Sequence, residues 1–132
     1  MIDEITYNGV TLAYIIASET SREKTYFPTP PELELQVGYV VHPAGGVVKA
    51  HAHLPVRRTV ERTCEVVVVK EGRCDVDLYA DGYLVVATRD LRQGDVLILV
   101  SGGHGFRMKE DTVLLEVKQG PYFGAAEKRL LQ

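Results

Sequence analysis

The chain has 132 residues, of which 45% are hydrophobic and 25% are charged, as in an ordinary globular domain. This length is sufficient for one domain with a hydrophobic core. The 15 basic and 18 acidic residues leave a formal net charge of -3. Because there is no positive excess, we expect neither a nucleic acid nor an anionic membrane surface as a partner.

The sequence predicts a cytoplasmic location. No apolar run reaches the roughly 20 residues that a membrane-spanning helix needs. The N-terminal residues Asp3 and Glu4 are acidic, where a signal peptide would carry basic residues. Cys64 and Cys74 are too few for a disulfide scaffold, so we expect two reduced thiols.

Turn-forming residues recur along the chain and separate short segments rich in Val, Ile, Leu, Tyr and Thr, which predicts an all-β sandwich or barrel. Tight turns at Glu71-Gly72 and Asp81-Gly82 predict two hairpins. Only Ala125 to Leu131 has the pattern of a short helix. In chain order, the expected strands are Ile5 to Tyr7, Thr11 to Ala17, Leu33 to Val41, a segment ending at His53, Cys64 to Lys70, Arg73 to Ala80, Tyr83 to Arg89, Val96 to Val100, a segment beginning near His104, and Val113 to Lys118.

Two histidines lie one residue apart at the end of the expected strand over residues 45–53. Side chains alternate between the faces of a strand, so His51 and His53 would share one face and form half of a metal site. Glu65, at the start of the next strand, and His104 are the candidates for the other half. Three imidazoles and one carboxylate suit one divalent transition metal: Fe, Mn, Ni, Zn or Cu.

These residues resemble the first motif of the cupin superfamily, G-x5-H-x-H-x3,4-E-x6-G. The matching positions are Gly45, His51, His53, Glu65 and Gly72. The departure lies between His53 and Glu65, where the eleven residues Leu54 to Cys64 replace a much shorter link. A lengthened hairpin would keep Glu65 in the site. Without an insertion, Arg57 or Arg58 would occupy the acidic position, and Glu61 is an alternative ligand.

The family's second motif, G-x5-P-x-G-x2-H-x3-N, is matched loosely. Its counterparts here are Gly94, Gly102 and His104, with Val100 in place of proline and Met108 in place of asparagine. The resemblance implies a single-domain jelly-roll β-barrel over residues 1–132. N-terminal strands and a short arm would occupy residues 1–32, the barrel core residues 33–122 and a tail residues 123–132. It also implies a homodimer.

The resemblance further implies a metal-dependent enzyme that acts on a small polar organic substrate. We expect substrate contacts from Lys49, Arg57, Phe106 and Met108, although Arg57 also suits a solvated loop and the last two also suit the barrel core. Catalytic residues are left unassigned, with Glu116, Tyr39 and Lys49 as candidate bases. Two alternatives remain open: a metal-independent isomerase acting on sugar nucleotides, because cupin isomerases carry a similar His-Ala-His element, and a non-catalytic cupin that binds a small ligand.

Overall fold

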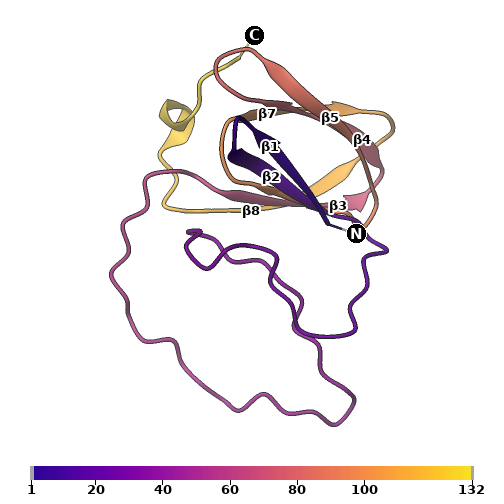
Figure 1. Cartoon of the computed structure of the whole chain (residues 1–132), viewed down its shortest axis with the longest axis vertical. Helices are drawn as coiled ribbons and strands as arrows, with labels where there is room; N and C mark the ends of the chain where they lie inside the picture. Colours follow the sequence, from indigo (N-terminus) through magenta and orange to yellow (C-terminus); the bar gives the residue numbers. More distant parts are fainter. Residues whose placement is uncertain (1, 132) are drawn as a thin grey trace. The chain divides into compact units, whose positions relative to one another are not determined.

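The computed structural model describes residues 2–131, and the chain divides into two compact units. The first unit consists of Met1–Thr20 and Thr63–Gln132, and the second unit is Ser21–Arg62. Each is described by itself. All named strands belong to the first unit (Figure 1). Among the described residues, no helix is long and apolar enough to cross a membrane.

The first unit contains two antiparallel sheets. The larger sheet has the strand order β1-β2-β6-β3-β8, with β1 (Ile2–Tyr7), β2 (Val10–Ile16), β6 (Val96–Leu99), β3 (Glu65–Glu71) and β8 (Val113–Lys118). The smaller sheet has the order β5-β4-β7, with β5 (Val85–Arg92), β4 (Arg73–Tyr79) and β7 (Gly103–Met108). The all-β fold class is therefore confirmed.

The core between the two sheets follows from alternating side chains. In β4, Cys74, Val76 and Leu78 are buried, while the aspartates between them are only half-buried. Two-residue periodicity places the apolar side chains on one face, towards the larger sheet, which contributes Val67 and Leu97 among others. Both cysteines are buried and free, as expected.

The connection between β3 and β4 is a corner between the sheets. β3 pairs with β6 and β8, whereas β4 pairs with β5 and β7. Gly72, with a φ of 90°, makes the turn. The predicted hairpin at Glu71-Gly72 is therefore wrong: a glycine with positive φ serves a sharp corner as well as a hairpin turn, and the local sequence does not distinguish them.

The second predicted hairpin is confirmed, with a longer loop than the Asp81-Gly82 signal suggests. β4 and β5 pair antiparallel, and the Ala80 N–H donates to the Leu84 carbonyl oxygen at 3.0 Å. β5 consequently begins at Val85, two residues later than expected.

The expected C-terminal helix shortens to the 3-10 turn η1 (Gly124–Glu127), which contains no buried residue that would hold a longer helix against the sheets.

The two sheets do not form a closed barrel. Strands β7 and β8 each pair with a single neighbour, β4 and β3 respectively, so they are edge strands in the part of the chain that the structure describes. The resemblance to jelly-roll proteins implies a closed barrel, but the described strands do not form a continuous ring of hydrogen-bonded neighbours. One side of the sandwich is left open between these two edges.

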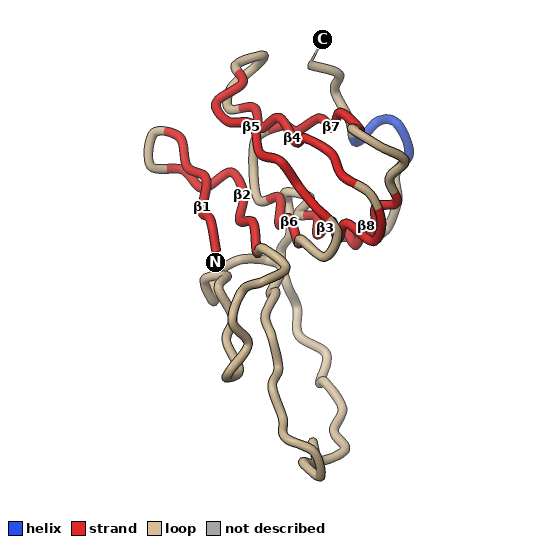
Figure 2. Tube along the Cα trace, turned by 90° about the vertical axis from the view of Figure 1, so that its right-hand side faces the viewer, coloured by secondary structure: helices blue, strands red, loops and turns tan. Residues whose placement is uncertain are grey.

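The second unit is drawn as loop throughout its length (Figure 2). The predicted strands over Leu33 to Val41 and over residues 45–53 are wrong. Their only ladder contact is a bridge in which the Tyr26 and Tyr39 backbones exchange hydrogen bonds of 3.0 and 2.9 Å. A strand needs a neighbouring strand whose backbone accepts and donates its hydrogen bonds, and no other residue of these two segments is paired in a ladder.

Candidate functional site

A cavity of about 740 Å³ opens on the side of the first unit where β7 and β8 are the sheet edges. Its volume falls within the roughly 300–1,000 Å³ typical of small-molecule sites. The C-terminal segment, residues 127–131, contributes a further wall. Figure 1 shows the yellow end of the chain passing from β8 through a helical turn and then running towards the side of the smaller sheet.

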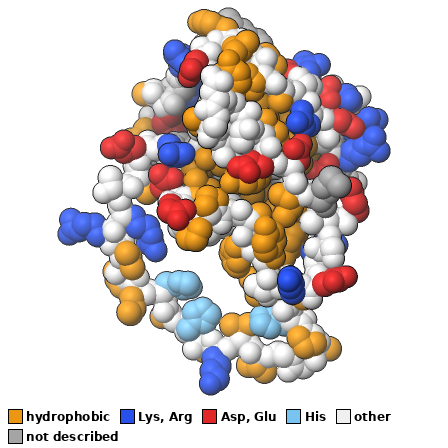
Figure 3. Space-filling model, in the orientation of Figure 1, with side chains coloured by type: hydrophobic (Ala, Val, Ile, Leu, Met, Phe, Trp, Pro, Cys, Tyr) orange, Lys and Arg blue, Asp and Glu red, His pale blue; other side chains and the backbone are white. Residues whose placement is uncertain are grey.

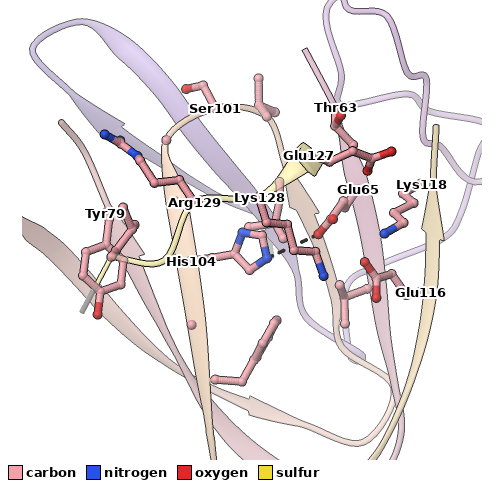
Figure 4. A pocket seen from close by; sticks show the side chains of 18 of the residues that line it. Thr63, Glu65, Tyr79, Ser101, His104, Glu116, Lys118, Glu127, Lys128 and Arg129 are labelled. Atoms are coloured by element: carbon pink, nitrogen blue, oxygen red, sulfur yellow. Dashed lines mark ion pairs between the residues drawn. The ribbon is translucent and has the colours of Figure 1, made fainter. Parts of the chain in front are cut away.

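The cavity has an apolar part and a polar part, both built by strand alternation. Its apolar lining includes Val67, Leu99, Phe106 and Leu114. On β3, Glu65 lies two residues before Val67, and on β7, His104 lies two residues before Phe106, so each pair shares a face. On β8, Leu114, Glu116 and Lys118 face the cavity in the same way, and their side chains are drawn in Figure 4.

Glu65 and His104 form an ion pair across the opening. Glu65 lies on the larger sheet and His104 on the smaller one, and the Glu65 Oε2 to His104 Nε2 distance is 3.3 Å (Figure 4). The two side chains are 12% and 32% exposed, so both remain accessible from the cavity. The His104 ring also packs edge-on against Phe106, with 5.8 Å between ring centroids.

The pair keeps Glu65 ionised. The hydrogen bond from His104 holds the pKa of Glu65 below its usual value, and it outweighs burial, which acts in the opposite direction. The charge of His104, a hydrogen bond with Glu116 and the charge of Lys118 also lower this pKa. A carboxylate beside an imidazole is an arrangement that orients the ring.

His51 and His53 belong to the second unit, where histidine side chains are exposed at the surface (Figure 3). Their ring centroids lie 5.3 Å apart, so the two imidazoles are neighbours without the expected strand. His51 Nδ1 lies 2.8 Å from the Lys49 carbonyl oxygen. Because a carbonyl only accepts, Nδ1 must donate, which leaves Nε2 of neutral His51 as an available lone pair.

The predicted metal ligands are thus found as two pairs, His51 with His53 and Glu65 with His104. Over residues 2–131, no group of three or more His, Cys, Asp or Glu side chains is gathered in a way that would hold a metal ion. Within the first unit, the pair supplies one nitrogen and one oxygen donor. This is fewer than the three or four protein ligands of a typical zinc site.

Of the predicted substrate contacts, only Phe106 is found lining the cavity. Met108 lies at the end of β7, 54% exposed and outside the cavity lining. Lys49 and Arg57 are exposed residues of the second unit.

Three cations of the cavity were not predicted from the sequence: Lys118, Lys128 and Arg129. Lys118 was predictable, because it lies two residues after the candidate base Glu116 on the same strand, and the two side chains therefore share a face. Lys128 and Arg129 follow η1 in an extended segment, and nothing local to them indicates a cavity.

Comparisons of the chain with protein-family models, curated proteins and solved structures found no significant match. Its function is therefore inferred from the chemistry of the cavity.

Proposed function

We propose that this chain is a cupin-type protein that binds a small polar organic molecule in the cavity of the first unit, beside Glu65 and His104. The observation that carries the proposal is the 3.3 Å ion pair between facing sheets, which lies at a cavity of small-molecule size. Glu65 and His104 are also two of the positions that match the cupin motifs. The apolar lining would receive the carbon skeleton of the ligand, and the ion pair its polar group.

The same pair is suited to proton transfer. Glu65 orients the His104 ring, and an imidazole held in this way can give a proton to a bound molecule or take one from it. Proton transfer of this kind requires the reacting atom within about 2.6–3.2 Å of the imidazole nitrogen. We propose enzymatic acid-base chemistry at His104, with Glu65 as the residue that positions it.

Binding is testable by two-dimensional NMR with a panel of small carboxylic acids, amides, alcohols and sugars. We expect ligands to shift the backbone signals of His104, Phe106 and Glu116. Replacing Glu65 with Gln should weaken binding of the uncharged hydrogen-bond donors in the panel, the amides, alcohols and sugars, about tenfold, the equivalent of about 1.4 kcal/mol, because a charge-assisted contact is lost. The dissociation constant is read from the titration.

Glu71→Gln is the matched control, because Glu71 is an exposed carboxylate at the other end of the same strand and lies outside the cavity lining. Its binding should equal that of the unmodified protein. A panel in which no compound moves the cavity signals, or in which shifts collect on the outer face of the smaller sheet, would contradict the proposal.

A divalent metal centre is the second candidate function. Two donors bound side by side at about 2.1 Å from one metal lie about 3.0–3.4 Å apart, depending on the coordination geometry. The Glu65–His104 separation of 3.3 Å agrees with this. Glu65 and His104 would supply two of the ligands of the ion. A metal bound there would polarise an oxygen of the ligand.

Elemental analysis of protein purified without added metal tests this candidate. We expect close to one metal ion per chain, and its loss in Glu65→Ala and His104→Ala. The Glu71→Gln protein serves again as the control and should retain the metal. Protein that takes up no metal even after incubation with Fe, Mn, Ni, Zn or Cu would eliminate the metal centre and leave the metal-free binding site.

A further inference from the structure

The cations of the cavity differ from the cations on or beside the smaller sheet. On or beside the smaller sheet, the basic residues in ion pairs with aspartates are Arg73, Arg89, Arg92, Arg107 and Lys109. Among residues 2–131, Lys118, Lys128 and Arg129 make no ion pair. Lys118 instead lies over the Tyr122 ring, 5.2 Å from its centroid. Three positive charges therefore line the cavity without a carboxylate in contact.

Two of the three carboxylates of the cavity, by contrast, have partners within the protein. Glu65 contacts His104 at 3.3 Å. Glu127 Oε2 accepts a hydrogen bond from the Phe123 backbone N–H at 2.6 Å. The lining holds equal numbers of acidic and basic side chains. Among the described residues, however, no hydrogen bond or ion pair joins an acceptor to the side-chain nitrogens of Lys118, Lys128 and Arg129, so these donors are available to a ligand.

Two of the three cations are carried by the C-terminal segment, which Gly103 helps to hold. A Cβ atom at Gly103 would collide with Leu131 Cδ1, so the absence of a side chain there lets Leu131 pack directly on the start of β7. This contact lies next to His104 in the sequence. Lys128 and Arg129 are thereby kept at the same cavity as the Glu65–His104 pair (Figure 4).

We propose that the ligand is a small organic anion, whose carboxylate or phosphate group is bound by Lys118 and Lys128. Its carbon skeleton lies on the apolar lining at Val67, Phe106 and Leu114. Ammonium and guanidinium groups are the protein's strong donors to carboxylate and phosphate oxygens, and a partly enclosed cavity strengthens each contact. This inference rests on the proposed function, because it assigns a ligand class to the same cavity.

Benzoate and benzamide form the decisive pair of probes, because they have the same shape and differ in charge. Both are titrated at constant ionic strength into the full chain, and the backbone signals of His104, Phe106 and Glu116 are followed by NMR. We expect benzoate to bind at least about tenfold more tightly than benzamide, as a charge-assisted contact requires.

Inorganic phosphate is then added to the benzoate complex. Displacement identifies phosphate as a further head group, and no displacement restricts the site to carboxylates; either result upholds the anion site.

Lys118→Met and Lys128→Met should each weaken benzoate binding about tenfold and leave benzamide binding unchanged. Lys70→Met is the matched control. Lys70 is an exposed lysine on β3 outside the cavity lining, and its substitution changes the net charge by the same amount. Equal effects of all three substitutions would overturn the inference, as would benzamide binding as tightly as benzoate. In that last case the cavity still binds a small polar molecule and the proposed function stands. If neither probe nor phosphate shifts the cavity signals, both fail.

Discussion

Gly72→Ala is expected to lower the free energy of unfolding of the first unit by about 3 kcal/mol, because two penalties act at one position. The φ of 90° is a backbone conformation that alanine adopts only with strain. In addition, a Cβ atom there would collide with the Asp111 carbonyl oxygen and lie 2.7 Å from Thr112 Cα. Urea unfolding followed by circular dichroism measures the change.

The backbone that opposes this Cβ atom is not free to move away. The Thr112 hydroxyl donates to the Glu110 carbonyl oxygen at 2.8 Å, and it accepts a hydrogen bond from the Arg73 N–H at 3.3 Å. These bonds join the corner between β3 and β4 to the turn between β7 and β8. Moving Asp111 and Thr112 aside would therefore break bonds that hold the two sheets together at this end.

Gly82→Ala separates the two penalties. Gly82 also has a positive φ, of 63°, but a Cβ atom there meets no atom within 4 Å. We expect a loss of only about 1 kcal/mol, the cost of the left-handed backbone for alanine. Equal losses for the two substitutions would show that the collision at Gly72 is relieved without cost, contrary to the expectation.

Leu97→Ala should destabilise the first unit by a similar amount, about 3 kcal/mol. Leu97 is fully buried in β6, a strand in the middle of the larger sheet, where its neighbours across the ladders are Ile15 and Val67. Removing its outer carbon atoms leaves a cavity that both sheets would have to move to fill. The midpoint of urea unfolding should fall while the slope of the transition stays unchanged.

Leu115→Ala is the control for Leu97→Ala. Leu115 lies in the edge strand β8 and is 51% exposed, so the same atoms are removed from a strand without emptying a packed site. The lost strand propensity is the same in both variants, and we expect a cost below about 1 kcal/mol for Leu115→Ala. Comparable losses in both variants would place the structural core elsewhere than between the two sheets.

Most strands of the first unit were predictable, because each carries its own signal. β8 has the predicted bounds, and β6 ends one residue early. The alternation of Cys74, Val76 and Leu78 with polar residues identified the buried face of β4. The same rule predicted that Glu65 shares a face with Val67, and that His104 shares one with Phe106. Both pairs line the cavity.

The strands expected in the second unit failed for a physical reason. Leu33 to Val41 has the composition of a strand, but a strand is stable only when other backbones complete its hydrogen bonds. In this unit only Tyr26 and Tyr39 meet that condition. Strand propensity is a property of the segment, whereas pairing depends on residues far away in the sequence.

The sequence by itself thus determined the all-β class, the positions of the strands in the first unit and the inward direction of Glu65 and His104, because side-chain alternation is a local property. Only the tertiary structure decided that β3 and β4 belong to different sheets, since a corner and a hairpin use the same glycine. It also decided that Lys128 and Arg129 join Lys118 at one cavity. Contacts between residues distant along the chain arise from packing, and no local pattern of charge or hydrophobicity encodes them.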